Sequence, residues 1–252
     1  MNTFYERIND SSKLKESKIV LALDLWPRHD LKDFVKKIIS LLEEHICAIK
    51  VNFHLILPLS AFDLSEINEL AHSYRIQSIA DIKLNDISST NEIAIAYLLK
   101  MGFDALIVNP FIGQTALKLA VQQTHRDNCG TIALVYMSYA EAKESFGIKI
   151  TNGIQGSNRI TKMYNLFLHR AYSSGVDGIV VGATQIDILR EISNRPEKIP
   201  IYSPGLGTQG GDIIEAAING TNFFIIGRSI INSKYPLNQV TKIKHKISRY
   251  VR

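Results

Sequence analysis

Eight short apolar runs, each followed by a segment with helical spacing, constrain the fold of this chain more than any other feature. The runs lie at Ile19–Leu23, Ile46–Ile49, Ser78–Ile82, Ala105–Val108, Ile132–Val135, Gly178–Val181, Ile199–Tyr202 and Phe223–Ile226. Continuous apolar strands that alternate with helices are typical of a parallel sheet buried on both faces. Eight such units in 252 residues predict an α/β protein, a closed (β/α)₈ TIM barrel. An open doubly wound sheet is the alternative that the pattern leaves.

The length of the chain suits one barrel domain over residues 1–252, with residues 1–17 as an N-terminal extension or a helix that precedes the first strand. Two cysteines far apart in the sequence, Cys47 and Cys129, offer neither a disulfide framework nor a metal knuckle. No apolar run approaches the roughly 18 residues of a membrane span, and the first residues are too polar for a signal peptide. We therefore expect a cytoplasmic protein without membrane association.

The net charge of +5 suits an anionic partner, either nucleic acid or a phosphorylated metabolite. The basic residues are dispersed, apart from the tail Lys242–Arg249, where Ile243 and Ile247 are four residues apart. That spacing predicts a final helix with one buried stripe and a solvated basic face. The charge pattern therefore favours a phosphorylated small molecule and argues against nucleic-acid binding.

The interval between the fifth and sixth apolar runs is longer than that between any other adjacent pair. It contains the segment Tyr139–Ser157, which includes Gly147, Gly153 and Gly156. The segment follows the fifth strand, on the face where barrel active sites form. A mobile lid and a tolerated surface loop are equally consistent with this sequence.

Charged residues cluster where the first three strands end, although a charge in a buried strand is costly unless it is paired. The cluster contains Asp24, Lys50, Asp81, Lys83 and Asp86. Asp81 and Lys83 are two residues apart, so on a strand their side chains point to the same side and are neighbours. With Lys50 on the adjacent strand they form an alternating array of ammonium and carboxylate groups. Such an array serves either catalysis or a salt-bridge network at the barrel mouth.

A glycine-rich loop, Ser203–Asp212, follows the seventh run, and Gly227 and Arg228 follow the eighth. Glycines let backbone N–H groups approach phosphate oxygens, and arginine offers a planar fork of donors to the dianion. Barrels commonly bind phosphate after strands seven and eight. The two segments together predict a phosphate site.

The stretch Asp81–Thr90 matches the D-x-K-x-x-D-I-x-x-T signature of orotidine monophosphate decarboxylases, and the chain resembles the short archaeal form of that family. Further positions of the family occur in the same order along nearly the whole chain, at Asp24, Lys50, Ser138, the Pro204–Asp212 loop, Gly227 and Arg228. The resemblance implies decarboxylation of orotidine 5′-monophosphate to UMP and CO₂ without metal or cofactor, in pyrimidine nucleotide synthesis.

The resemblance also implies catalytic roles for four residues. Lys83 would protonate the C6 carbanion, and Asp81 would lie against the substrate carboxylate. Lys50 and Asp86 would complete the charged array and reach the ribose hydroxyls. Asp86 and Thr90 would enter the site of the neighbouring subunit, so that a homodimer is required for activity.

The other residues that the resemblance implies bind the substrate. Asp24 would contact the ribose and Ser138 the pyrimidine. Gln209 and Arg228 would grip the phosphate. Pro204 and Gly227 are further substrate-binding positions of the two phosphate-site segments.

Two other functions compete with this interpretation. A sister group of sugar-phosphate decarboxylases and aldol synthases shares D-x-K-x-x-D but uses Mg²⁺, and it carries glutamate at the position of Lys50, where an ammonium would repel the metal. The second is a catalytically silent barrel that binds nucleotides or serves as a scaffold. The intact residues Asp81, Lys83, Asp86 and Arg228 argue against a silent barrel.

Overall fold

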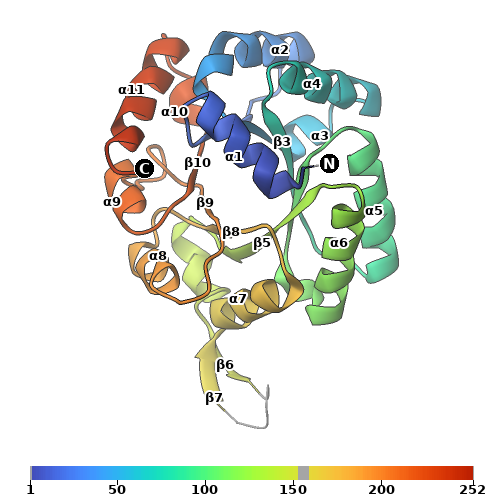
Figure 1. The fold of residues 1–252 in the computed structure, drawn as a ribbon, viewed down its shortest axis with the longest axis vertical. Coiled ribbons are helices and arrows are strands. Elements are labelled where there is room, and N and C mark those ends of the chain that lie inside the picture. The colour runs from blue at the N-terminus through green and yellow to red at the C-terminus, as the bar shows by residue number, and fades with distance from the viewer. Residues whose placement is uncertain (1, 153–158, 252) are drawn as a thin grey trace.

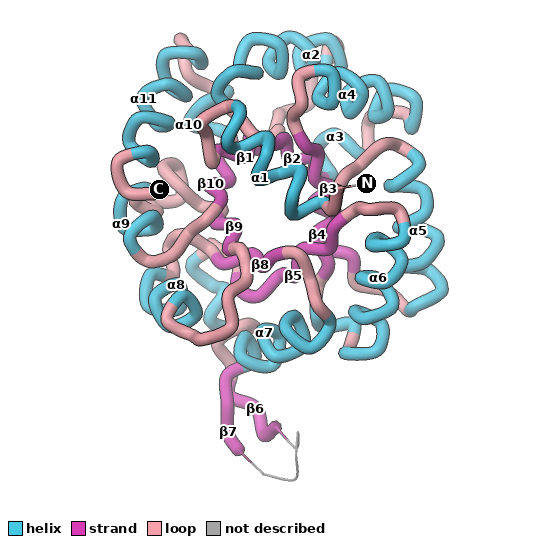
Figure 2. The backbone as a smooth tube through the Cα atoms, viewed as in Figure 1, coloured by secondary structure: helices cyan, strands magenta, loops and turns pink. Residues whose placement is uncertain are grey.

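Residues 2–152 and 159–251, which a computed structural model describes, contain a closed barrel of eight parallel strands in the order β1-β10-β9-β8-β5-β4-β3-β2 (Figure 2). The barrel strands are β1 Ile19–Ala22, β2 Ala48–Asn52, β3 Gln77–Leu84, β4 Ala105–Val108, β5 Gly130–Tyr136, β8 Gly178–Val181, β9 Ile201–Ser203 and β10 Phe223–Ile226. The predicted (β/α)₈ barrel is thus confirmed, and the open sheet is not. Every residue of β1, β4, β8 and β10 is buried, as strands covered on both faces require.

Helices surround the barrel between consecutive strands (Figure 1). The α-helices that follow β1 are α2 Leu31–Leu42, α3 Phe53–Ile56, α4 Ala61–Ser73, α5 Ser88–Lys100, α6 Gln114–Arg126, α7 Met163–Ser174, α8 Ile186–Ser193, α9 Ile213–Ile218, α10 Arg228–Ile231 and α11 Pro236–Ser248. In α11, Val240, Ile243 and Ile247 are buried while Lys242 and Lys246 are exposed, which confirms the predicted final helix with a basic outer face. Within the described ranges, no helix combines the length and the apolar character needed to cross a membrane.

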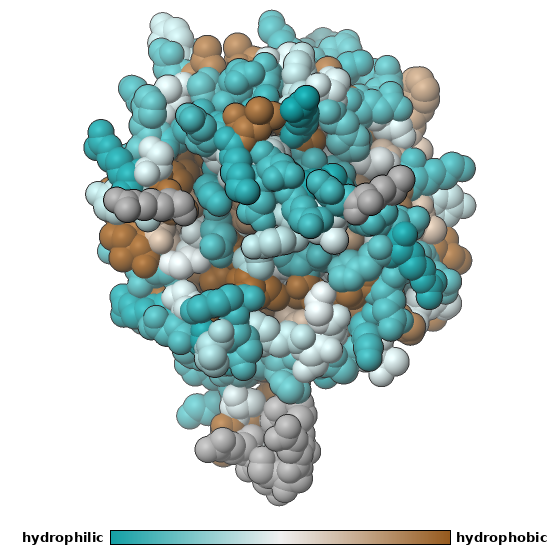
Figure 3. All heavy atoms as spheres, viewed as in Figure 1, coloured by the Kyte–Doolittle hydropathy of each residue, from teal (hydrophilic) through white to brown (hydrophobic). Residues whose placement is uncertain are grey.

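The N-terminal residues form a helix, α1 Phe4–Leu14, that crosses the amino end of the barrel (Figures 1 and 2). Thr3 and Glu6 form a capping box at its start. The Phe4 ring packs on Gly130 so closely that no side chain would fit at that position, and Ser11 Oγ donates to Cys47 O at 2.8 Å. The outer face of this end is mostly hydrophilic (Figure 3). Helix α1 therefore closes the barrel end opposite to the carboxyl ends of the strands.

The insertion after β5 consists of a short 3₁₀ helix, η3 Ala140–Glu144, and two antiparallel strands, β6 Lys149–Asn152 and β7 Arg159–Lys162. The strand pair projects away from the barrel beyond α7 (Figure 1). Its base is tied by the bond from Met163 N to Ile148 O, at 2.9 Å. The positions Gly153, Gly156 and Ser157 of the segment for which a lid and a surface loop were both open lie outside the described residues.

Candidate active site

A cavity of about 230 Å³ opens at the carboxyl end of the barrel, and all eight barrel strands or the loops after them contribute to its wall. Nine of the residues predicted from the sequence line it, namely Asp24, Lys50, Asp81, Lys83, Ser138, Pro204, Gln209, Gly227 and Arg228. Asp24 and Arg228, about 200 residues apart in sequence, meet here because parallel strands bring their carboxyl ends to one face. The structure therefore brings these nine residues together around one cavity.

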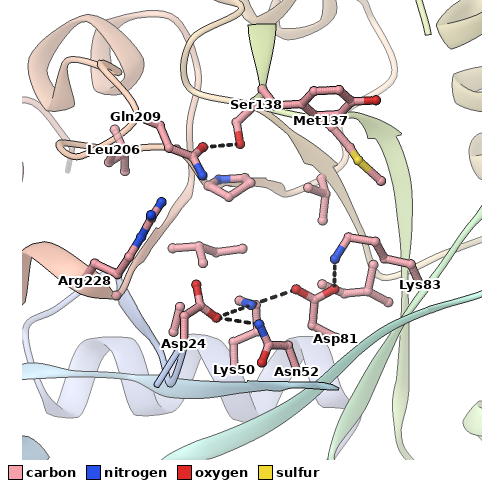
Figure 4. Close-up of a pocket in the computed structure, with 18 of the residues that line it drawn as sticks. Asp24, Lys50, Asn52, Asp81, Lys83, Met137, Ser138, Leu206, Gln209 and Arg228 are labelled. Atoms are coloured by element: carbon pink, nitrogen blue, oxygen red, sulfur yellow. Dashed lines mark hydrogen bonds and ion pairs between the residues drawn. The ribbon is translucent and has the colours of Figure 1, made fainter. Parts of the chain in front are cut away.

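The charged side chains of the cavity form the expected alternating array (Figure 4). Lys50 Nζ lies 2.7 Å from Asp81 Oδ2 and 3.3 Å from Asp24 Oδ1. Lys83 Nζ lies 2.8 Å from Asp81 Oδ1. Each carboxylate oxygen of Asp81 thus faces a different ammonium group, so Asp81 is fixed between two cations.

The array is buried at Lys50 and Asp81, whose side chains are 6% and 8% exposed, and it opens to solvent at Lys83, at 39%. Burial alone would lower the pKa of Lys50, but the carboxylates of Asp81 and Asp24 outweigh it and hold that pKa above its usual value. Burial alone would raise the pKa of Asp81, but Lys50 and Lys83 hold that pKa below its usual value. The array therefore keeps its buried members charged.

Lys83 reaches this position through an irregular backbone. Its φ is +45°, and the pairing register between β3 and β4 shifts between Ala80 and Leu84. A lysine in the left-handed region costs roughly 1–2 kcal/mol relative to ordinary strand geometry. Simple strand alternation predicted the correct neighbour, Asp81, although the strand is distorted at Lys83. Strain of this kind is often found at functional sites.

The uncharged wall of the cavity is built around Ser138, whose Oγ donates to Gln209 Oε1 at 2.7 Å. Gly182 and Gly205 approach Ser138 so closely that a side chain at either position would collide with it, and Gly205 has a φ of +93°. Thr184 Oγ1 donates to Ser138 O at 2.8 Å. The loops after β5, β8 and β9 are thereby held together around one residue, Ser138.

The end of the cavity formed after β9 and β10 suits an anion. Gly207 and Gly210 have φ values of +75° and +90°, which allow a tight loop near Gln209. Arg228 begins α10 and lines the cavity, and its guanidinium has no ion-pair partner within residues 2–152 and 159–251. An unpaired guanidinium beside a glycine-rich loop is a suitable phosphate ligand.

Asp86 and Thr90, the other two predicted residues, do not line the cavity of their own chain. Both are exposed, and Asp86 Oδ1 accepts a hydrogen bond from Ile87 N at 2.7 Å. Asn91 fixes the turn by donating from Nδ2 to Asp86 O at 2.7 Å. The single chain therefore leaves these two side chains at the start of α5 on the outer surface.

Sequence reasoning missed Asn52, which lines the cavity and donates from Nδ2 to Asp24 Oδ1 at 2.8 Å. The signal was available, because Asn52 follows Lys50 by two residues, the spacing that identified Asp81 and Lys83 as neighbours. An amide carries no charge, and the prediction rested on charged side chains at strand ends. Within the described parts of the chain, no three His, Cys, Asp or Glu side chains lie close enough to hold a metal ion.

The closed barrel and the charged cavity together define the class of (β/α)₈-barrel enzymes that act on an anionic small molecule. Sequence comparison narrows that class. A sequence model of the "Orotidine 5′-phosphate decarboxylase / HUMPS family" matches residues 17–243, and the chain belongs to this family.

Individual relatives agree with the family match. The chain is 30% identical over 233 residues to orotidine 5′-phosphate decarboxylase of Pyrococcus furiosus, covering 92% of this chain and 98% of that one. It is 31% identical over 236 residues to the protein of the same name from Methanosarcina barkeri, covering 92% and 96%. The crystal structure of orotidine 5′-monophosphate decarboxylase from Methanocaldococcus jannaschii with the inhibitor BMP superposes with a TM-score of 0.76, at 28% identity, covering 92% and 98%.

Proposed function

We propose that this protein decarboxylates orotidine 5′-monophosphate to UMP and CO₂ with no metal or cofactor. The observation that carries the proposal is the array Lys50–Asp81–Lys83, set in one cavity with Arg228, whose guanidinium has no ion-pair partner among the described residues. The array supplies a proton donor beside a fixed carboxylate, and Arg228 supplies a binding group for a phosphate. The family and the relatives named above support the same reaction.

The reaction breaks the bond between C6 of the pyrimidine and its carboxyl group. CO₂ leaves, and the electron pair of the broken bond stays on C6. The ammonium of Lys83 stabilises that pair and donates a proton to form the new C–H bond. Lys83 is then left neutral, and because its side chain is 39% exposed it can regain a proton from water.

The neighbours of Lys83 fix its position for this step. Asp81 holds the Lys83 ammonium at 2.8 Å and would lie against the carboxyl group that leaves. Lys50 holds the other oxygen of Asp81 at 2.7 Å, so Asp81 cannot turn away. Because these contacts exist before substrate binds, little reorganisation is needed in the transition state.

The remaining cavity residues would bind parts of the substrate that do not react. Asp24 takes a ribose hydroxyl, and Ser138 takes the pyrimidine. The phosphate lies on Gln209 and Arg228, along the loops that contain Pro204 and Gly227. Binding energy from the distant phosphate can then be used to close these loops over the site.

The metal-free assignment rests on charge. Two ammonium groups, from Lys50 and Lys83, occupy the array around Asp81, and they would repel a divalent cation. The test is an ultraviolet assay of orotidine monophosphate consumption before and after exhaustive chelation, and we expect the rate to persist. Loss of the rate in chelator, with recovery on adding Mg²⁺, would place the protein with the magnesium-dependent sister group.

We further propose a homodimer in which Asp86 and Thr90 enter the site of the partner. Both side chains are exposed at the start of α5, beside a surface on which Ile87, Ile93 and Tyr97 are 69%, 60% and 61% exposed. Large exposed apolar side chains that cluster on one helix are typical of a surface covered in an assembly. A second copy on this surface would bury them and complete the two sites.

A mixing experiment tests the shared sites. The variants Lys83→Ala and Asp86→Asn are prepared separately, confirmed to be inactive, mixed and allowed to exchange subunits. With shared sites, each mixed dimer has one site with both substitutions and one with neither. Half of the dimers are mixed after random exchange, so about a quarter of wild-type activity is the expected ceiling. If Asp86 served its own chain, mixing would restore nothing.

We also propose that the protein works in the cytoplasm, within pyrimidine nucleotide synthesis. Cys47 and Cys129 are free thiols, and burial raises the pKa of Cys47 to about 12 and that of Cys129 to about 11. Thiols of this kind are unreactive and suit a reducing compartment.

A further inference from the structure

Asn52 is held between the end of β2 and the start of α3, with both ends of its amide engaged. Its Oδ1 accepts from His54 N at 2.9 Å, as an N-cap, and its Nδ2 donates to Asp24 Oδ1 at 2.8 Å. The backbone contact fixes the orientation of the amide, because only the oxygen can accept from an N–H group. The nitrogen is therefore directed at Asp24.

Asp24 receives this hydrogen bond on one oxygen only. Its Oδ1 takes both the Asn52 amide at 2.8 Å and the Lys50 ammonium at 3.3 Å, and its side chain is 30% exposed. The other oxygen points away from Lys50 and Asn52, toward the open interior of the cavity (Figure 4). Asp24 is thus presented to a ligand with one oxygen anchored, and within the described parts of the chain its other oxygen accepts no hydrogen bond.

We propose that Asn52 is a positioning residue that fixes the Asp24 carboxylate for a substrate hydroxyl and leaves Lys50 committed to Asp81. This inference rests on the proposed function, in which Asp24 binds the ribose. It adds a residue that acts through Asp24 and that the family signature in this sequence does not contain.

The distances around Lys50 support the second half of this role. Lys50 Nζ lies closer to Asp81, at 2.7 Å, than to Asp24, at 3.3 Å. Without the amide, the ammonium of Lys50 would be the remaining donor to Asp24 Oδ1, and both carboxylates would compete for one buried cation. The neutral amide of Asn52 satisfies Asp24 without adding a charge, so the alternating array is preserved.

The substitution Asn52→Ser removes one of the two contacts of the amide and keeps the other. Serine is a good N-cap and retains an acceptor for the start of α3, but it is too short to reach Asp24. Asn52→Ser is therefore the test variant. Asn52→Ala loses both contacts, so the difference between the two variants shows what the cap alone contributes. Urea unfolding of each protein measures the effect on stability.

The experiment is a double-mutant cycle of Asn52→Ser and Asp24→Ala, with steady-state decarboxylation of orotidine monophosphate as the readout. We expect Asn52→Ser to lower kcat/KM about 10- to 100-fold, the effect of losing a hydrogen bond to a charged group, mainly through a higher KM. In the Asp24→Ala background the same substitution should change kcat/KM by less than about twofold, because its target is absent.

Three outcomes would overturn the inference while the proposed function stands. They are a wild-type rate for Asn52→Ser, equal effects of this substitution with and without Asp24, or a fall in kcat at constant KM. A wild-type protein that does not consume orotidine monophosphate would remove the proposed function, and the inference with it. The two failures are therefore distinguished by the wild-type assay.

Discussion

At the amino end of the barrel Asp104 and Asp177 direct their carboxylates at backbone N–H groups, whereas at the carboxyl end Asp81 directs its carboxylate at two lysine side chains. Asp104 Oδ2 accepts from Ser78 N, and Asp177 Oδ2 accepts from Thr131 N, each at 2.8 Å. Both oxygens of Asp81 face ammonium groups. The same residue type therefore supports the strands at one end and forms an electrostatic site at the other.

The contacts at the amino end follow a repeated pattern. A residue directly before a strand accepts from an N–H group near the start of the neighbouring strand. Asp104 before β4 does so for β3, Asp177 before β8 for β5, and Asn222 before β10 for β9, where its Oδ1 accepts from Ile201 N at 2.8 Å. Each contact satisfies a backbone donor that would otherwise be buried without a partner.

The difference between the two ends has a consequence for substitutions. Side chains at the carboxyl end contact mainly each other and the open cavity, so removing one leaves the hydrogen bonds of the barrel intact. Side chains at the amino end hold the backbone, so removing one exposes an unsatisfied donor. Activity should depend on the carboxyl end, and the free energy of unfolding on the amino end.

The largest effect is expected for Lys83→Ala, which removes the proposed proton donor. We expect kcat to fall at least about 10³-fold, because proton transfer and charge stabilisation are lost together. The free energy of unfolding should change by less than about 1 kcal/mol, because Lys83 is 39% exposed and Asp81 keeps its contact with Lys50. Steady-state kinetics and urea unfolding measure the two quantities.

Lys32→Ala is the matched control for this prediction. Like Lys83, Lys32 is a partly exposed, ion-paired lysine: it is 33% exposed and pairs with Asp63 at 2.8 Å and Glu66 at 2.9 Å, but it lies on α2 outside the cavity. Its removal should leave kcat within about twofold of wild type. A large loss of activity in this variant, or a retained rate in Lys83→Ala, would contradict the separation of roles.

The strand core could be predicted closely from the sequence. The runs Ala105–Val108, Gly178–Val181 and Phe223–Ile226 match β4, β8 and β10 at both ends, because strands buried on two faces are apolar throughout. The strands β6 and β7 were not predicted. They are short and partly polar and pair only with each other, so no continuous apolar run marks them.

The site was predictable where charge revealed it, and less so where only geometry did. Lys50, Asp81 and Lys83 stood out because charges seldom end apolar strands. The sequence placed Lys50 at a strand end, but β2 continues to Asn52, because polar side chains inside the barrel mouth can pair with each other. The positive φ of Lys83 and the contact of Asn52 with Asp24 depend on backbone detail that no pattern encodes.

A smaller effect, on stability alone, is expected for Asp104→Ala. Asp104 is 7% exposed and also accepts from Arg7 Nη2 at 3.0 Å and contacts His72 Nε2 at 2.8 Å. We expect a loss of about 2–4 kcal/mol in the free energy of unfolding, with kcat unchanged within about twofold. Asp177 has no arginine partner within the described residues, so Asp177→Ala should lower the free energy of unfolding by less, about 1–2 kcal/mol. Equal losses of unfolding free energy in the two variants would show that the contact of Arg7 with Asp104 contributes nothing to stability.

The smallest expected effect is on the pH dependence of the free energy of unfolding, to which His72 contributes. The hydrogen bond to Asp104 raises the pKa of His72 above its ordinary value of 6.5, against the opposing effects of burial and of Arg7. A raised pKa in the folded protein means that the stabilisation is fully present below the pKa of the unfolded chain and is lost as pH rises through the folded pKa. The free-energy difference between wild type and His72→Gln should therefore be larger at pH 5.5 than at pH 8.5.

The size of this pH effect is limited by solvent. His72 is 39% exposed, so we expect at most about 1 kcal/mol after screening, measured as the change in that difference between the two pH values by urea unfolding. Asp104→Ala supplies the control background, because without the carboxylate the partner that raises the pKa is gone, and His72→Gln should then have the same effect at both pH values. A difference that grows with pH in the wild-type background would reverse the sign of the linkage, and the contact between His72 and Asp104 would then hold the neutral imidazole in place of the cation.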